Sequence, residues 1–174
     1  IGIVGFLNVF NFMDGIDGLA AAEALFVGAA AAFLMQASGK EVSDAYWLAV
    51  SIAAAAAGFM MLNWAPARIF MGDIGSGFLG FSLAFVATLS VFQGQLPIYV
   101  WLILTAAFTV DASLTLLMRA FRGERVYEAH RSHAYQRLSR RLGSHGRVAT
   151  LYSLVNVVWL LPLAWLSSEV PNWG

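Results

Sequence analysis

Residues 74–92 read IGSGFLGFSLAFVATLSVF and carry no charged side chain. A helix must be about 20 residues long and predominantly apolar to cross the roughly 30 Å hydrocarbon core of a bilayer. This stretch meets both requirements. It therefore predicts a membrane-spanning helix.

Four further segments of similar length and hydrophobicity flank this stretch. Ile1–Phe12 is interpreted as the end of a sixth helix, and because the chain starts inside it, we expect the C-terminal part of a longer protein. The predicted fold class is all-α: a polytopic transmembrane helix bundle with about five full spans plus the end of a sixth. The five predicted spans are Gly18–Gln36, Ala45–Trp64, Ile74–Phe92, Pro97–Arg119 and Val148–Leu166.

The composition also indicates lipid as the solvent. Of the 174 residues, 60% are hydrophobic and only 11% are charged, whereas an ordinary soluble domain is about 25% charged. A water-soluble protein of this size needs more polar side chains to cover its surface, which argues against a soluble all-helical core. The absence of cysteine excludes disulfides and cysteine-based zinc sites.

Positive charges are distributed unequally between the two sides that alternating spans define. Lys40 lies on one side, and the arginines all lie on the other, in or beside the connections 13–17, 65–73 and 120–147. This asymmetry predicts that the arginine-rich side is cytoplasmic. We interpret the chain as a single membrane domain, residues 1–174, that contains the cytoplasmic loop 120–147.

Three polar clusters interrupt the apolar chain, all on the predicted cytoplasmic side, and the first is residues 8–18, NVFNFMDGIDG. Asp14 and Asp17 are three residues apart, so in a helix they share one face, and Asn8 and Asn11 precede Asp14 by about two turns and one turn. Two carboxylates at a membrane helix end are costly unless they are paired, hydrated or bound to a cation. The cluster therefore predicts a functional site, with a solvated helix terminus as the alternative.

The second cluster is residues 70–77, FMGDIGSG, just before a predicted span. Such a loop can present backbone N–H groups to phosphate, which makes Gly72 and Ser76 candidate substrate-binding residues. Asp73 would oppose the charge of a phosphate unless a hard cation joined them, and Mg²⁺ does so through one or two carboxylates and substrate oxygens. The alternative is a plain turn.

The third cluster is residues 130–137, HRSHAYQR, in the long cytoplasmic loop. If the segment is helical, His130, His133 and Arg137 share one face. Cations such as Arg131 can neutralise a diphosphate, and a histidine can orient or protonate a leaving oxygen. A zinc site, which lacks a third nitrogen or sulfur ligand here, and a basic loop that holds anionic lipid are the alternatives.

Two acids lie inside predicted spans. Asp111 is eight residues before Arg119 at the end of its span, which places it about 12 Å below the cytoplasmic boundary. An acid at that depth is a functional candidate by default, and a structural partner for an Asn, a Ser or an arginine is an equal alternative. Glu23, near the start of its helix, is interpreted as structural.

The three clusters resemble, in this order and on one side, the motifs of the polyprenyl-phosphate N-acetylhexosamine-1-phosphate transferase family. Residues 11–19, NFMDGIDGL, look like its Asn-x-x-Asp-Gly-x-Asp-Gly-Leu motif, and residues 70–76, FMGDIGS, look like its Phe-Met-Gly-Asp-x-Gly-Ser motif. Residues 130–138, HRSHAYQRL, are similar to the histidine loop of the O-antigen-type branch rather than the triple-histidine form of the peptidoglycan branch. The resemblance covers essentially the whole chain.

The resemblance implies an enzyme of the bacterial inner (plasma) membrane whose active site faces the cytoplasm. It would transfer an N-acetylhexosamine 1-phosphate from a UDP-amino sugar to undecaprenyl phosphate, release UMP and use Mg²⁺ or Mn²⁺. The product would initiate a lipid-linked surface glycan such as the O-antigen of lipopolysaccharide. Membrane lipids and a homodimer are further expected partners, and nucleic acid is not.

The resemblance also implies roles for individual residues. Asp73 would be the best metal ligand and Asp14 a second one. The predicted catalytic residues are Asp14, Asp17, Asp73, His130 and His133, and the predicted substrate-binding residues are Asn8, Asn11, Gly72, Ser76, Arg131 and Arg137. Two features depart from the family: Tyr135 stands where many relatives have another histidine, and an upstream Asp-Asp motif is absent. The chain alone is therefore expected to be inactive.

Two rival classes of membrane protein share some of these features. CDP-alcohol phosphatidyltransferases also place Asp-Gly pairs in membrane helices, but their pattern has Ala-Arg soon after the first pair, where this chain has LAAAE at residues 19–23. A polytopic transporter with no transferase activity is the remaining alternative. It predicts acids near the bilayer midplane, and only Asp111 favours it.

Overall fold

The structure is a computed structural model that describes residues 2–123 and 133–169. Within these residues the chain contains helices and no strands, which confirms the predicted all-α class. Two predicted site residues, His130 and Arg131, lie outside the described residues. The elements are α1 (Ile3–Met13), α2 (Leu19–Ala37), α3 (Asp44–Asn63), α4 (Gly72–Phe92), α5 (Ile98–Leu104), α6 (Ala106–Phe121), α7 (Ala134–Leu142), α8 (His145–Val155), a π-helical turn (Asn156–Leu160) and α9 (Leu161–Ser168).

Four helices of the described chain are long and apolar enough to cross a membrane. They are α2, α3, α4 and the continuous helix His145–Ser168, which contains α8, the π-helical turn and α9. The bent pair α5–α6 is a fifth span if it is counted as one. The protein is therefore a multi-pass membrane protein, as predicted.

The predicted span Pro97–Arg119 is not one straight helix. α5 and α6 meet at Thr105 with a bend of 77°. The Thr105 hydroxyl donates to the carbonyl oxygen of Trp101 at 2.8 Å, and a hydroxyl bonded to the preceding turn favours bending. The two halves also pack on different helices, α5 on α9 and α6 on α1. An apolar run in the sequence does not reveal that its two halves have different neighbours.

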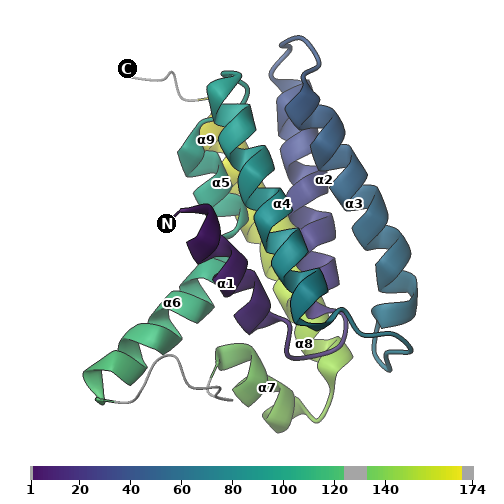
Figure 1. Cartoon of the computed structure of the whole chain (residues 1–174), viewed down its shortest axis with the longest axis vertical. Helices are drawn as coiled ribbons and strands as arrows, with labels where there is room; N and C mark the ends of the chain where they lie inside the picture. The colour runs from purple at the N-terminus through teal and green to yellow at the C-terminus, as the bar shows by residue number, and fades with distance from the viewer. Residues whose placement is uncertain (1, 124–132, 170–174) are drawn as a thin grey trace.

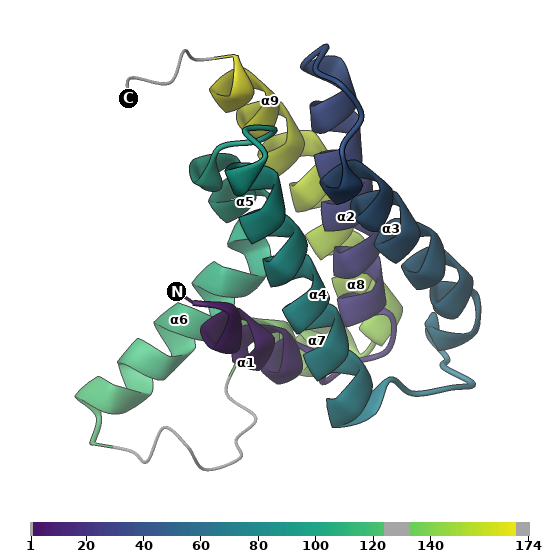
Figure 2. The same cartoon turned by 45° about the horizontal axis from the view of Figure 1, so that its top comes forward.

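Figures 1 and 2 show α2, α3, α4 and the last span grouped as a bundle, with α6 projecting outward from it. α2 is the central span, since 72% of its most apolar 18-residue stretch is buried. In the other three spans at most 33% of the corresponding stretch is buried. Small residues allow α3 to approach it closely: a Cβ on Gly28 would lie 2.9 Å from the carbonyl oxygen of Ala49. Such close approach is typical of membrane helix pairs.

The loops between the helices form two groups, one at each end of the bundle (Figure 1). At one end, the Gln95 side chain donates to the carbonyl oxygen of Glu41 at 3.1 Å, so the α2–α3 and α4–α5 loops touch. At the other end, Asp17 contacts Ala67 and His145. The α1–α2 loop, the α3–α4 loop and the start of α8 therefore lie together, in agreement with the predicted grouping.

Candidate active site

The segment between α1 and α2 is a turn, and the prediction that Asp14 and Asp17 share a helical face is wrong. α1 ends before Asp14 and α2 begins after Gly18. Gly18 has a φ of 78°, a left-handed conformation that glycine adopts without steric cost. Its amide donates to Oδ1 of Asn63 at 3.1 Å. α3 therefore holds the end of this turn in place at Gly18. Asp14 and Asp17 lie at different positions in the turn, and their surroundings differ.

Asp17 connects three segments at this end of the bundle. Its Oδ2 atom accepts a hydrogen bond from the amide of Ala67 at 3.2 Å and lies 3.3 Å from Nδ1 of His145. The Asn63 side chain also bonds to the loop between α3 and α4, because it donates to the carbonyl oxygen of Ile69 at 2.9 Å. Sequence reasoning missed Asn63 and His145, because they lie 45 and 128 residues from the residues they contact.

Asn11 and Ser76 bring the first two clusters together. The Ser76 hydroxyl, fully buried at 0% exposure, donates to Oδ1 of Asn11 at 2.7 Å. This contact is possible because α1 and α4 are close: a Cβ on Gly80 would lie 2.9 Å from the Cα of Leu7. Asn8, one turn earlier, is exposed. The substrate-binding roles of these residues stay predictions.

Asp14 and Asp73 interact electrostatically. Asp73 lies in the first turn of α4. Its neighbour Gly72 has a φ of 66°, again in the left-handed region that favours glycine. Burial, and after it the negative charge of Asp73, raises the pKa of Asp14 to about 7. A nearby cation would favour the ionised form of both carboxylates.

These two carboxylates could take part in holding a hard cation such as Mg²⁺. The described residues contain no group of three or more His, Cys, Asp or Glu side chains that could hold an ion by themselves. Mg²⁺ does not need such a group, because it binds one or two carboxylates and completes its shell with waters and substrate phosphates. The carboxylate pair Asp14–Asp73 therefore matches the donor set that Mg²⁺ uses beside a phosphate.

His133 does not share a helical face with Arg137, because α7 begins directly after it and His133 is the N-cap residue. Its ring is buried and stacks on Phe12 with the ring centroids 6.2 Å apart. Its Nδ1 atom lies 3.6 Å from Oδ1 of Asp111. Arg137 is exposed on α7. The structure thus places His133 inside the protein and Arg137 on its surface.

Asp111 is a structural partner, although not of the residues considered from the sequence. Its Oδ1 accepts the amide of Ala134 at 2.9 Å, and its Oδ2 accepts the amide of Tyr135 at 3.1 Å. The hydroxyls of Thr115 and Tyr152 donate to the same carboxylate at 3.2 and 2.7 Å. Asp111 therefore links α6, the start of α7 and α8.

Tyr135 connects α7 to the turn that carries Asp14. Its hydroxyl donates to the carbonyl oxygen of Phe12 at 2.9 Å, and the Gln136 side chain donates to that hydroxyl at 3.1 Å. A Cβ on Gly15 would lie only 2.2 Å from the Tyr135 oxygen. Burial raises the pKa of Tyr135, so the phenol stays neutral and remains a donor.

Glu23 has the structural role that its position suggested. The Asn156 side chain donates to its Oε2 atom at 2.6 Å, and both side chains are buried. Asn156 is also the first residue of the π-helical turn. The pair joins α2 to the last span.

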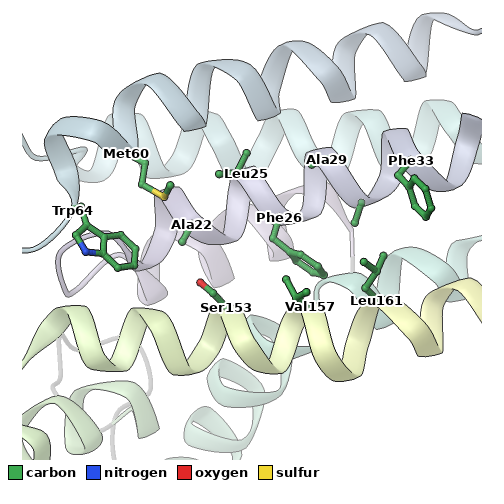
Figure 3. A pocket seen from close by; sticks show the side chains of 11 residues that line it. Ala22, Leu25, Phe26, Ala29, Phe33, Met60, Trp64, Ser153, Val157 and Leu161 are labelled. Carbon is green, nitrogen blue, oxygen red and sulfur yellow. The ribbon is translucent and has the colours of Figure 1, made fainter.

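Two open grooves between the spans have mostly apolar linings. One, of about 490 Å³, lies between α2, α3 and the last span (Figure 3). The other, of about 420 Å³, lies between α6 and α8 and is bordered by Asp111, Ala134 and Tyr152. Their linings suit hydrocarbon rather than a diphosphate, so the polar candidate site is the cluster of loops at the end of the bundle.

The fold and the site together define a multi-pass membrane protein with two interacting carboxylates at one end of its bundle. The family model for glycosyl transferase family 4 matches residues 1–91, which contain the first two polar clusters. The chain belongs to this family, the polyprenyl-phosphate hexosamine-1-phosphate transferases, and this confirms the resemblance found in the sequence.

Individual relatives have two kinds of names. The chain is 32% identical over 138 residues to a probable undecaprenyl-phosphate N-acetylglucosaminyl 1-phosphate transferase of Bacillus subtilis, covering 78% of this chain and 38% of that protein. It is 37% identical over 128 residues to a phospho-N-acetylmuramoyl-pentapeptide-transferase of Heliobacterium modesticaldum, covering 72% and 38%. A transferase of the latter name from Carboxydothermus hydrogenoformans is 28% identical over 91% of this chain and 47% of its own length. The chain thus spans less than half the length of these relatives.

Proposed function

We propose that the intact protein transfers an N-acetylhexosamine 1-phosphate from a UDP-sugar to undecaprenyl phosphate and releases UMP. Family membership supports this reaction class, and the name of the Bacillus subtilis relative supports the lipid acceptor. The observation that carries the proposal is that the Ser76–Asn11 hydrogen bond joins the first two polar clusters, whose acids Asp14 and Asp73 interact electrostatically, at the end of the bundle where Tyr135 of α7 bonds to Phe12.

The proposed reaction needs alignment and charge neutralisation more than a strong base. An oxygen of the lipid phosphate, already anionic, forms a bond to the β-phosphorus of the UDP-sugar. The bond between that phosphorus and the bridging oxygen breaks, and UMP leaves with the electron pair. A site that holds the two substrates in line and offsets their negative charge accounts for catalysis of this kind.

We further propose Mg²⁺, or Mn²⁺, as the cofactor, held by Asp73 and Asp14. The ion would neutralise phosphate charge when bound. The chain's own contribution is to hold the two carboxylates at the ends of α1 and α4, which the Ser76–Asn11 bond keeps together. The contacts of Asp17 with Ala67 and His145 support a role in shaping the loop rather than direct chemistry.

We propose that part of the lipid chain lies along the groove between α6 and α8. Its lining is almost entirely apolar, and it reaches Ala134 at the start of α7. An isoprenoid chain in this groove would bring its phosphate toward the basic surface of α7, which includes Arg137. We propose that this end of the bundle faces the cytoplasm of a bacterial cell, because the sequence places its arginines in or beside the connections at this end.

The test is a transfer assay on the intact protein in detergent or vesicles. UMP release that requires both polyprenyl phosphate and Mg²⁺ is the expected result. Flux of substrate across vesicles without UMP release would instead indicate the transporter alternative and would refute the proposal.

The sugar can be identified by comparing two donors in the same assay. We propose an N-acetylhexosamine donor of the O-antigen type, because residues 130–138 contain two separated histidines rather than three in a row. UDP-N-acetylglucosamine is expected to support UMP release. Release from UDP-N-acetylmuramoyl-pentapeptide alone would contradict this assignment and favour the peptidoglycan reaction.

A further inference from the structure

We propose that Asp111 is a positioning residue: it fixes α7 in place and, through Tyr135, sets the turn that carries Asp14. The link to catalysis rests on the proposed function. The structural part of the proposal does not, because it concerns contacts within this chain. Four donors among the described residues meet at the one carboxylate of Asp111 on α6: the amides of Ala134 and Tyr135 and the hydroxyls of Thr115 and Tyr152.

α7 needs an external acceptor. It is 9 residues long, and an isolated helix of that length is marginal in water. The first amides of a helix have no acceptor within the helix. Here the amides of Ala134 and Tyr135 donate to separate oxygens of Asp111 at 2.9 and 3.1 Å. Asp111 therefore caps α7 from another helix.

The last span holds the carboxylate itself in place. The Tyr152 hydroxyl donates to Oδ2 of Asp111 at 2.7 Å, while Thr115, on the same helix as Asp111, donates to Oδ1 at 3.2 Å. A carboxylate can accept at both oxygens at once, whereas an asparagine side chain has only one acceptor oxygen. The Asp111→Asn substitution therefore turns one of the amide acceptors into a donor.

Tyr135 connects α7 to the turn that contains Asp14. It is the second residue of α7, its amide is fixed by Asp111, and its hydroxyl donates to the carbonyl oxygen of Phe12, two residues before Asp14. Gly15 packs against the same hydroxyl. A shift of α7 would therefore remove both contacts and loosen the start of the turn at Asp14 and Gly15, whereas its end at Gly18 is held separately by Asn63.

Hydrogen exchange of the intact protein, measured by mass spectrometry, tests whether Asp111 holds α7 and whether Tyr135 of α7 in turn holds the turn 14–18. In Asp111→Asn, we expect exchange of the α7 amides and of the turn 14–18 to rise about tenfold to a hundredfold, as the loss of charge-assisted hydrogen bonds predicts. Tyr152→Phe, a milder change, should give a smaller rise in the same two segments. Tyr135→Phe should raise exchange in the turn 14–18 and leave α7 protected.

Ser90→Ala is the matched control. It removes the acceptor for the Trp101 indole, a buried contact of 2.7 Å, and should leave exchange in α7 unchanged. If Asp111→Asn and Tyr152→Phe leave α7 as protected as this control, Asp111 does not position α7. If α7 opens while the turn 14–18 stays protected, the link through Tyr135 is refuted.

A kinetic measurement separates this inference from the proposed function. If the unmodified protein releases UMP, Tyr135→Phe should lower kcat severalfold with thermal stability retained, whereas an equal loss in Ser90→Ala would contradict a positioning role. If the unmodified protein releases no UMP under any condition, the proposed function fails, and the exchange data still decide whether Asp111 positions α7.

Discussion

At the scale of single residues, the acidic side chains differ because their hydrogen-bond donors differ. Asp17 and Asp111 are each bonded to backbone amides of other segments. Asp14 is partly buried beside Asp73, and its raised pKa reflects burial and then that neighbouring charge. Acids bonded to amides hold the fold, whereas a partly buried acid that feels the negative charge of another acid is typical of a site that binds a cation or a proton.

Asp73→Asn in the intact protein is expected to lower UMP release by at least about a hundredfold if Asp73 is the main metal carboxylate, as proposed. Membrane insertion should stay normal, because Asp73 is exposed in the first turn of α4. The measurement is the rate of UMP release at saturating Mg²⁺. Asp44→Asn, in the first turn of α3 at the opposite end, is the control. Full activity of Asp73→Asn would refute the metal assignment.

Gly15→Ala is expected to disturb the site because the new Cβ would lie 2.2 Å from the Tyr135 hydroxyl. We expect UMP release to fall about tenfold or more, as small misplacements at a reacting site do. Residues in contact show non-additive effects, so Gly15→Ala combined with Tyr135→Phe should be about as active as Tyr135→Phe alone. Strictly additive losses in the double variant would show that the two side chains do not collide.

At the scale of elements, several helices are joined by a few polar contacts within an apolar surface. α2 and the last span are joined by the Glu23–Asn156 pair, and α1 and α4 by Asn11 and Ser76. α5 and α6 separate because each half packs on a different helix. In lipid, apolar burial drives helix association only weakly, so such contacts and close packing of small residues select the neighbours.

Asn156→Ala should therefore destabilise the bundle by about 1–2 kcal/mol, because it leaves the buried Glu23 carboxyl without its donor. The measurement is unfolding of the intact protein in mixed micelles. Ser153→Ala is the matched control, since Ser153 donates only to Ala149 in its own helix at 2.9 Å. Equal stability of the two variants would mean that the pair contributes nothing to packing.

At the scale of the whole molecule, the arrangement of loops gives a prediction about orientation. These 174 residues contain no cysteine, so a single cysteine introduced among them, in an intact protein otherwise free of cysteine, can report which side of the membrane it faces. Glu41→Cys and Arg68→Cys lie in exposed loops at opposite ends of the bundle. In intact cells, a membrane-impermeant thiol reagent should label the cysteine at 41 and not the one at 68. Labelling only at 68 would invert the proposed orientation.

The sequence alone was enough to determine the class of the fold and the polar clusters. Uninterrupted apolar runs of span length leave few alternatives to membrane helices, because a bilayer cannot satisfy exposed backbone groups. The turn at Asp14–Gly18 was misjudged as helical, since a spacing of three residues fits a helix and a turn equally well. The break at Thr105 was missed for a similar reason: the apolar run continues across it.

What only the tertiary structure decided is which side chains meet. Asp111 was left between a functional and a structural role until the amides of α7 and the hydroxyl of Tyr152 were found on its oxygens. Tyr135 was noted only as a departure from the family, although it joins α7 to Phe12 across 123 residues. Contacts between segments this distant depend on how the helices pack, and local periodicity carries no information about that packing.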